Sequence, residues 1–429
     1  MQYYQFKPYN VARWLIWSLF AIVLIVMPLI FRSSLAVTIL SQMGIAIIAC
    51  LSYNMLLGHG GMLSFGHAMY SGLGAYLSMH ALNAITSGSF PIPVSLVPLV
   101  GGLAGMGFAI LFGYVSTRKS GTTFAMITMG LGELVFAMSL MVPEFFGGEG
   151  GISGNRVAGK PFMGITYGPP TQVYYLIAVY TFVSVGLMYA FTRTPLGRML
   201  NAVRDNPERV EFVGYNTHRI RYTAFIIAGF FAGISGGLGA LNFEIVTAEV
   251  LHAARSGSYL LFTFLGGATF FFGPIIGAIL MVLAFVLFSE FTKAWLLYLG
   301  LVFLFMVMYA PGGFASLIMM NVRVAAFGRL RELWRNYLFL LVSSLMALLG
   351  AAAIVEMIYH LQLNAMMGSE LPFAGVTLDV KSMGSWVGST GLMLVGVALF
   401  EVARRRFSVQ WGAIQAYIEK EMKRREGGV

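Results

Sequence analysis

Long apolar runs alternate with short polar stretches along the whole chain, and most of the runs have the length that crosses a lipid bilayer. A helix of roughly 20 apolar residues spans the hydrocarbon core of a membrane. Runs of this kind predict helices at residues 11–31, 35–57, 62–82, 93–115, 122–142, 172–191, 222–242, 295–311, 337–358 and 384–402. The pattern therefore predicts an all-α, polytopic integral membrane protein.

One apolar stretch, residues 258–289, is too long for a single crossing. Gly266, Gly267, Gly273 and Pro274 interrupt it near its middle. Glycine and proline at membrane depth favour a break in a helix. We therefore predict two short helices that meet at a turn, with a re-entrant half as the alternative to two full crossings.

The distribution of lysine and arginine distinguishes one crossing from two in this stretch, because basic residues gather in cytoplasmic loops. The chain has 27 of them, and the largest groups lie at 192–221, 323–335 and 403–429. With two crossings, all three groups share the side of Lys7 and Arg13 near the amino terminus. With one crossing, the last two groups would face outward. We therefore predict about twelve transmembrane segments, including broken or re-entrant helices, with both termini cytoplasmic.

Composition agrees with this class and narrows the kind of protein. Hydrophobic residues make up 58% of the chain and charged residues only 10%, which excludes an ordinary soluble domain. The lone Cys50 excludes an internal disulfide framework and a CxxC metal or redox site. The first apolar run is too long for a typical signal peptide and lacks a clear cleavage site, so we expect the mature protein to retain it.

We predict one membrane domain over residues 1–318 and an extension over residues 319–429. The extension holds a basic connector, two further transmembrane helices and a basic tail with arginines at 404–406. Basic residues near an anionic leaflet contribute about 1 kcal/mol each. The net charge of the chain is +10, and we expect the tail to lie on membrane lipid rather than to bind nucleic acid.

The polar loop over residues 192–221 is predicted to form a short capped helix. Asn206 can cap its start, Pro207 fits the first helical position and Gly214 can end it. A rigid helix with mixed charges suits a reversible contact with a partner protein. The alternative is a solvated loop whose arginines only fix topology. The candidate contact residues are Arg204, Asp205, Asn206, Glu208 and Gly214.

Polar side chains inside the apolar runs are candidates for a translocation pathway. Glycines beside them, such as Gly58, Gly60 and Gly61, permit close packing and local unwinding. A carboxylate at membrane depth costs at least ~2.5 kcal/mol unless it is paired or solvated. The alternative is that these side chains only tie helices together. The candidates are Asn54, Ser64, His67, Glu133 and Asn242.

The glycine-rich stretch within residues 143–171 is predicted to lie outside the membrane. Its turns offer a surface on which a binding protein could dock, and the alternative is a flexible loop without a partner. The candidate docking residues are Gly148, Glu149 and Gly151.

Nucleotide and metal sites find little support in the sequence. Residues 154–161 nearly spell a phosphate-binding loop, but Pro161 follows Lys160 where a hydroxyl group should hold Mg²⁺. His59 and His67 have no adjacent carboxylate to complete a set of metal ligands. We therefore expect neither site in this chain.

Four motifs together resemble a known family. They are Gly58 to Ala68 with Gly72 to Tyr76, Thr123 to Glu133, Phe146 to Gly154, and Ala202 to Arg209. Their order and spacing over about residues 35–318 resemble the permease subunits of bacterial branched-chain amino acid ABC importers, in particular the LivM-like subunit. The segment after Val322 is longer than the pattern of that family.

The resemblance implies a function and a set of partners. The loop at 192–221 is similar to the coupling helix that contacts a nucleotide-binding subunit. The implied partners are two ATP-binding subunits, a second permease subunit and a periplasmic solute-binding protein. ATP and magnesium would be bound by the partners, and this chain would hold no cofactor. The implied place is the bacterial inner (plasma) membrane, and the implied solutes are branched-chain amino acids or, as in some relatives, urea or amides.

Two other classes of protein compete with this interpretation. A self-contained, proton-coupled secondary transporter could use Glu133 or His67, but the internal duplication expected of one is not evident. A membrane enzyme would need a cluster of Asp, His or Cys at one membrane face, and the carboxylates here are scattered. The leading prediction is therefore a transport subunit that is not itself an enzyme.

Overall fold

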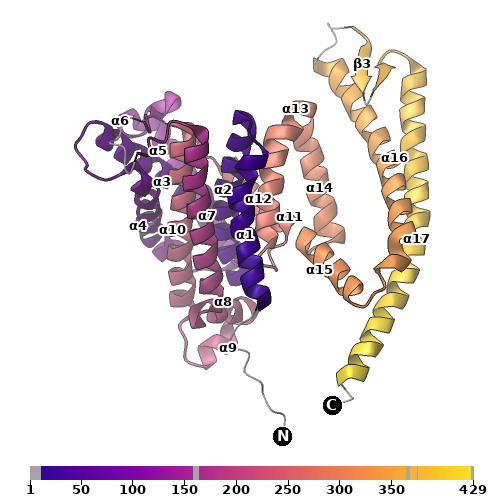
Figure 1. Cartoon of the computed structure of the whole chain (residues 1–429), viewed down its shortest axis with the longest axis horizontal. Helices are drawn as coiled ribbons and strands as arrows, with labels where there is room; N and C mark the ends of the chain where they lie inside the picture. The colour runs from indigo at the N-terminus through magenta and orange to yellow at the C-terminus, as the bar shows by residue number, and fades with distance from the viewer. Residues whose placement is uncertain (1–10, 158–163, 364–367, 374, 427–429) are drawn as a thin grey trace. The chain divides into compact units, whose positions relative to one another are not determined.

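The computed structural model describes residues 11–157, 164–363, 368–373 and 375–426. Lys7, Lys160 and Pro161 lie outside these residues, and the side chain of Arg13 is not described either. The described chain is helical apart from two small two-stranded sheets, which confirms the predicted all-α polytopic class (Figure 1). It divides into two compact units, one of residues 1–287 and 305–315 and one of residues 288–304 and 316–429.

The first unit holds most of the long helices. They are α1 (Val11–Ile30), α2 (Ser34–Asn54), α3 (His67–Thr86), α4 (Val97–Ser116), α5 (Gly121–Met141), α7 (Pro170–Arg193) and α10 (Thr217–Phe243). Short helices join them, namely the π-helix η1 (Met55–His59), η2 (Val94–Leu96), α6 (Pro143–Phe146), η3 (Gly148–Gly150), α8 (Pro195–Asp205), α9 (Pro207–Phe212) and η4 (Ala248–Leu251). Strand β1 (Ile152–Ser153) pairs antiparallel with β2 (Ile245–Val246). Within this unit, α6 lies at one end and α8 and α9 lie at the other (Figure 1).

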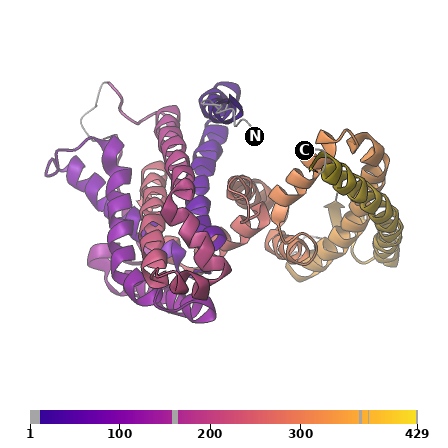
Figure 2. The same ribbon diagram turned by 90° about the horizontal axis from the view of Figure 1, so that it is seen from below.

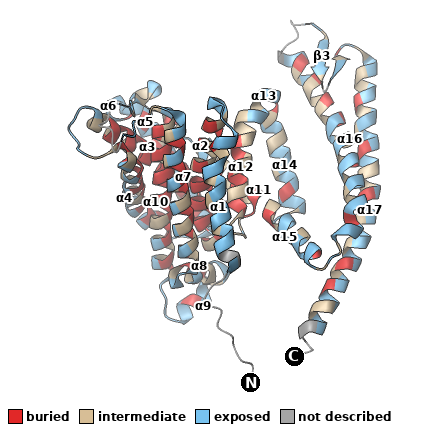
Figure 3. Cartoon of the chain, viewed as in Figure 1, coloured by how far each residue is buried: buried red, intermediate tan, exposed pale blue. Residues whose placement is uncertain are grey.

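Helix α10 lies at the centre of the first unit, where it packs against α2, α3 and α4. Small residues make this packing close. A β-carbon added to Gly74 of α3 would lie 2.6 Å from Cα of Gly233, and one added to Gly105 of α4 would lie 2.9 Å from the same atom. Glycine at such contacts lets membrane helices approach each other. Buried residues accordingly gather along these helices and appear as red segments in the interior of the first unit in Figure 3.

The outer helices of this unit present apolar side chains at the surface. Helix α1, indigo in Figure 2, lies at the edge of the unit and packs against α7, with the Trp17 and Phe182 ring centroids 5.8 Å apart. Among the described residues, eight helices are long and apolar enough to cross a membrane, and the count is nine if the bent pair of α14 (Trp295–Tyr309) and α15 (Gly313–Ala326) is one span. The chain is therefore a multi-pass membrane protein. The count of about twelve crossings and the cytoplasmic termini stay predictions.

The stretch predicted to break contains two helices, α11 (Ala253–Gly266) and α12 (Gly273–Leu283). The π-helix η5 (Ala284–Phe288) and α13 (Ser289–Phe291) continue α12. The pair is antiparallel, because a β-carbon on Gly277 would meet the carbonyl of Phe262 and one on Gly266 would meet Gly273. Gly267 has a φ of +111°, a backbone conformation that residues other than glycine rarely adopt. The predicted turn between two short helices is thus present.

A second break follows, between α14 (Trp295–Tyr309) and α15 (Gly313–Ala326), whose axes differ by 51°. The turn of this second break contacts the turn between α11 and α12. A β-carbon on Gly313 would lie 2.5 Å from the backbone of Gly267. Gly313 itself has a φ of +67°, so both turns require glycine for their conformation and for their contact.

Two long antiparallel helices dominate the second unit, α16 (Leu330–Leu363) and α17 (Met383–Glu426), joined by the hairpin of β3 (Glu370–Phe373) and β4 (Val376–Asp379). Both extend beyond the predicted spans at 337–358 and 384–402. The basic tail is helical as far as Glu426, since no proline interrupts it and ion pairs such as Glu401 with Arg404 at 2.8 Å support the helix.

Candidate functional site

The connection between α2 and α3 is the most irregular part of the buried interior. Helix α2 passes into the π-helix η1, and residues 61–66 are not helical before α3 begins. Glycine is required at two points here. Gly61 has a φ of +62°, and a β-carbon on Gly66 would collide with the backbone of Thr128 in α5. The predicted helix at 62–82 therefore begins only at His67, after the local unwinding that its glycines permit. A π-helix inside an α-helical run is frequent at functional sites.

His67 lies at the centre of this interior and is fully buried. Its Nε2 lies 2.9 Å from Oγ of Ser52, and the Ser52 hydroxyl donates to the carbonyl of Ala49 at 2.8 Å. Because that donation uses the only serine proton, Nε2 of His67 carries a proton and donates to Ser52. Nδ1 is then an acceptor, and it has no hydrogen-bond partner among the described residues.

The interruption consists of residues 55–66, namely η1 and the non-helical segment after it. Ser64 lies within it, Asn54 and His67 flank it, and all three are buried. Oδ1 of Asn54 and Oγ of Ser64 are also buried without a hydrogen-bond partner in the described part of the chain. Buried polar atoms are nearly always paired, so these unpaired atoms are candidates for hydrogen bonds to water or to a polar solute group. Three of the five predicted pathway residues thus lie within or beside the interruption.

The other two predicted pathway residues lie elsewhere. Glu133 is exposed on the outer face of α5, whereas Thr128 and Gly132 of the same helix face the interruption. Asn242 lies near the end of α10, and its carbonyl accepts from the Arg156 guanidinium at 3.1 Å. The sequence alone could not distinguish these two residues from the other three, because neighbouring helices determine which face of a helix is covered. The roles of all five stay predictions.

The loop at 192–221 contains two helices rather than one. Asn206 ends α8 and caps α9, where its Oδ1 accepts from the backbone amide of Arg209 at 3.0 Å. Pro207 is the first residue of α9, and Gly214 follows it with a φ of +93°. The predicted cap, first position and end of the short helix are therefore all present. Asp205 and Glu208 are exposed.

Helix α8 is attached to the interruption described above. Arg204 donates to the carbonyl of Gly58 in η1 and also pairs with Asp205 at 2.8 Å. Oδ1 of Asn201 lies 3.0 Å from Nδ1 of His59. Sequence reasoning treated Arg204 only as a surface residue and gave Asn201 no role, because these contacts join positions that are far apart in the chain.

The tip of this loop is apolar, which the sequence analysis missed. Phe212, Val213 and Tyr215 are 89%, 74% and 51% exposed. An exposed aromatic cluster beside a capped helix is typical of a protein contact. The signal was present in the sequence as three apolar residues in an otherwise polar loop.

At the opposite end of the first unit, the predicted docking residues lie on a fixed loop. Gly148 and Gly151 have φ values of +63° and +69°, and Glu149 between them is exposed. Arg156 holds the loop in place, with Nε donating to the carbonyl of Tyr167 at 2.7 Å and Nη1 lying 3.7 Å from a Glu244 oxygen. The sequence analysis gave Arg156 and Glu244 no role, since their contact also joins distant segments.

Within the described residues, no three His, Cys, Asp or Glu side chains come close enough together to hold a metal ion. The polar features of the first unit that bear on function are the buried segment between α2 and α3, the α8–α9 loop, the fixed loop at the other end and the exposed Glu133 of α5.

Comparison with known proteins places these features in a family. Residues 35–311 match the model of the permease component of branched-chain amino acid transport systems. The chain belongs to this family. The matched region contains the interruption, the α8–α9 loop and Glu133, and it ends before α16 and α17.

Individual relatives agree with the family match. The chain is 31% identical over 299 residues to the high-affinity branched-chain amino acid transport system permease protein LivM of Salmonella typhimurium, covering 65% of this chain and 69% of that protein. It is 30% identical over 290 residues to LivM of Escherichia coli, covering 63% and 67%. A fructose import permease protein, FrcC of Rhizobium meliloti, is 24% identical over 237 residues, covering 47% and 58%. No solved structure matches.

These matches confirm the LivM-like resemblance that the four sequence motifs predicted. Members of the family are permease components of transport systems and not enzymes. As a component of a transport system, the chain is expected to work with other subunits.

Proposed function

We propose that this chain is the permease subunit of an ATP-driven importer that moves branched-chain amino acids, or related small solutes such as urea or amides, across the bacterial inner membrane. The observation that carries the proposal is the attachment of α8 to η1 through Arg204 and Asn201. A subunit that receives work from outside needs a rigid element tied to its interior, and these contacts supply one.

The contacts continue from the cytoplasmic loop into the membrane. Arg204 bonds the Gly58 carbonyl, and the adjoining non-helical segment bonds α5 through the Phe65 amide and Oγ1 of Thr128 at 3.2 Å. An importer changes access by shifting between inward-open and outward-open states. A displacement of α8 would therefore reach the interruption first and α5 next.

The proposed source of that displacement is an ATP-binding subunit. Phe212 and Tyr215 at the tip of the loop are suited to enter a pocket on such a partner, with Asp205, Glu208 and Arg209 around them as a polar rim. In this proposal two ATP-binding subunits hold ATP and Mg²⁺, and this chain has no nucleotide site of its own.

The exposed position of Glu133 within a span supports the presence of a second permease subunit. A carboxylate that faces lipid costs at least ~2.5 kcal/mol, so the exposed face of α5 is expected to be covered by protein or to line a wet pathway. We propose that a second permease covers this face and that the solute passes beside it, where Glu133 can pair with the ammonium group of an amino acid. The fixed loop with Glu149 would then receive the periplasmic solute-binding protein.

Affinity purification of the tagged chain in mild detergent, followed by transport measurement in proteoliposomes, tests the proposal. Wild type is expected to bring down ATP-binding subunits and a second permease, and to import solute only with ATP. Phe212→Ser is expected to lose the ATP-binding subunits, whereas Phe90→Ser, at the opposite end of the first unit, keeps them. Transport by the chain alone under a proton gradient, without ATP, would establish the secondary-transporter alternative instead.

A further inference from the structure

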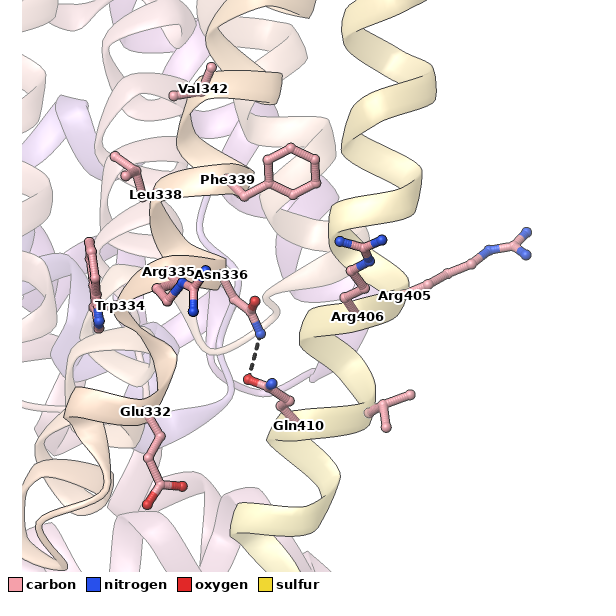
Figure 4. Close-up of a pocket in the computed structure, with 11 residues that line it drawn as sticks. Glu332, Trp334, Arg335, Asn336, Leu338, Phe339, Val342, Arg405, Arg406 and Gln410 are labelled. Carbon is pink, nitrogen blue, oxygen red and sulfur yellow. Dashed lines mark hydrogen bonds between the residues drawn. The ribbon is translucent and has the colours of Figure 1, made fainter.

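A groove of about 1030 Å³ runs between α16 and α17 in the second unit, outside the residues that the family model matches (Figure 4). The residues that line it come from one stretch of each helix, namely Glu332, Trp334, Arg335, Asn336, Leu338, Phe339 and Val342 of α16, and Arg405, Arg406, Val409 and Gln410 of α17. Neither the transport pathway nor the α8–α9 loop uses it.

The groove is divided into a basic part and an apolar part. Arg335 and Arg406 lie at the same level on the two helices in Figure 4, with Phe339 and Val342 on one side of them and Gln410 on the other. Asn336 and Gln410 are bonded at 2.7 Å and close that polar end. The groove is thus basic at one level and apolar at the next, which matches an amphiphile with a charged head and apolar chains.

Two guanidinium groups in the groove are free to bind an anion. Arg405 pairs with Glu401 at 2.9 Å, and the one carboxylate of the groove, Glu332, pairs with Arg329 at 2.5 Å. Within the described residues, neither Arg335 nor Arg406 forms an ion pair. Two unpaired positive charges on facing helices favour an anionic ligand. Arginine suits phosphate in particular, because its planar group can donate two parallel hydrogen bonds.

The level of these arginines matches the edge of a membrane. Residues 337–355 of α16 carry no charge, a run of roughly the length that spans the hydrocarbon core. In α17 the first charged residue after Met383 is Glu401, just before the arginines. Trp334 is exposed beside Arg335, and tryptophan is enriched where hydrocarbon meets headgroups. The groove therefore opens at headgroup depth.

We propose that this groove binds an anionic phospholipid, with the phosphate of its headgroup held by Arg335 and Arg406 and its acyl chains lying along Leu338, Phe339 and Val342. Basic pockets between membrane helices on the cytoplasmic side are suited to such headgroups. The extension thus carries a lipid site that is separate from transport.

Binding of phosphatidylglycerol and of phosphatidylcholine to the purified, delipidated full chain in detergent tests this site. Native mass spectrometry gives the dissociation constant of the first bound lipid. Each arginine near an anionic headgroup is worth about a fivefold preference. The double variant Arg335→Gln/Arg406→Gln is therefore expected to bind phosphatidylglycerol roughly 25-fold more weakly than wild type, with little change for phosphatidylcholine.

The matched control is Arg331→Gln/Arg424→Gln, which removes one arginine from each of the same helices outside the groove. It is expected to bind phosphatidylglycerol as wild type does, and excess glycerol phosphate is expected to leave the lipid bound. Equal binding of the two lipids by wild type would overturn the proposal. An equal loss of phosphatidylglycerol binding in the control pair would also overturn the proposal, because it indicates a diffuse basic surface. Full displacement of the lipid by glycerol phosphate would overturn it too, because it indicates a site for a free phosphate compound.

Discussion

Arg204 joins the α8–α9 loop to η1, so its replacement tests the proposed coupling at a single residue. Arg204→Ala leaves the Gly58 carbonyl without this donor, which costs about 1–3 kcal/mol where the group stays buried. We expect transport in the reconstituted complex to fall by roughly tenfold, the equivalent of 1.4 kcal/mol, while the ATP-binding subunits stay bound and hydrolyse ATP. Solute uptake and ATP hydrolysis are measured in the same vesicles.

Lys119→Ala is the matched control for Arg204, because Lys119 is an exposed basic residue between α4 and α5 and lies outside the α8–α9 loop. It should leave uptake per ATP hydrolysed unchanged. If Arg204→Ala also leaves that ratio unchanged, the attachment is only structural and the coupling route is wrong.

Gly66 tests the close contact between the non-helical segment and α5. A β-carbon there would collide with the Thr128 backbone, and backbone atoms cannot rotate away as a side chain does. We expect Gly66→Ala to destabilise the protein by about 1–3 kcal/mol, measured by thermal unfolding in detergent. Gly107→Ala, where the added carbon meets no atom within 4 Å, should unfold at or slightly above the wild-type temperature. Equal unfolding temperatures for the two variants would contradict the close approach.

At the scale of residues, the sequence predicted what depends on near neighbours in the chain. The Asn206 cap and the Gly214 end follow from cap chemistry within one turn of helix, and both are present. The bond between Arg204 and Gly58 joins residues 146 positions apart, so no local pattern contains it. The same reason explains why Arg156 was given no role.

Among the elements, α5 presents the sharpest test of the pathway, because its two faces differ. One face contacts the interruption, and the other exposes Glu133. If the exposed face lines the pathway, Glu133→Leu removes a partner of the solute, and we expect uptake by the complex to fall about tenfold, a barrier change of roughly 1.4 kcal/mol. Leu134→Ala, at an exposed neighbouring position, should retain uptake.

The opposite result for α5 would also be informative. If this face meets only lipid, Glu133→Leu removes a carboxylate from hydrocarbon and should stabilise the protein without reducing uptake. The two outcomes are separated by measuring uptake and thermal unfolding on the same preparations. The sequence predicted that Glu133 lies within a span, but not its face, because the face is set by which helices pack against α5.

The end of α17 was the element least accessible to sequence reasoning. The tail is helical and packs against α15 and α16 through a buried cluster, which the sequence analysis did not predict, and its position on membrane lipid stays a prediction. The cluster consists of Val324, Leu333, Ile414 and Ile418. These apolar residues are spaced along the helix among many charged residues. The sequence analysis relied on the charges, whereas the spacing of the apolar residues determines which helices pack together.

Ile418 tests this packing. Ile418→Ala removes a buried side chain and is expected to cost roughly 2–5 kcal/mol locally. The helix end should then open more often, and trypsin should cleave faster at Lys420 and Lys423, as measured by mass spectrometry of the digest. Ala416→Ser, at an exposed position on the same turn, should digest at the wild-type rate. Equal rates for the two variants would mean that the end of α17 is not held by the cluster.

For the whole molecule, the antiparallel pair α11 and α12 bears on the predicted membrane topology. A pair of helices that turns back on itself returns the chain to the side it left, whether or not either helix crosses fully. At 14 residues, α11 is about 21 Å long, less than the hydrocarbon thickness, which favours a re-entrant or broken pair. With such a return, the distribution of lysine and arginine predicts that the basic groups at 323–335 and 403–429 are on the same, cytoplasmic side as 192–221.

This topology predicts the side from which each loop can be labelled. The native Cys50 is buried, so single cysteines introduced elsewhere report on their own positions. A membrane-impermeant thiol reagent added to intact cells should modify Glu149→Cys and Lys381→Cys. Glu208→Cys and Lys420→Cys should react only after the inner membrane is opened. Labelling of Lys420→Cys, but not Lys381→Cys, in intact cells would mean that the α11–α12 stretch crosses once, because one crossing inverts everything after it and leaves Glu149 and Glu208 unchanged.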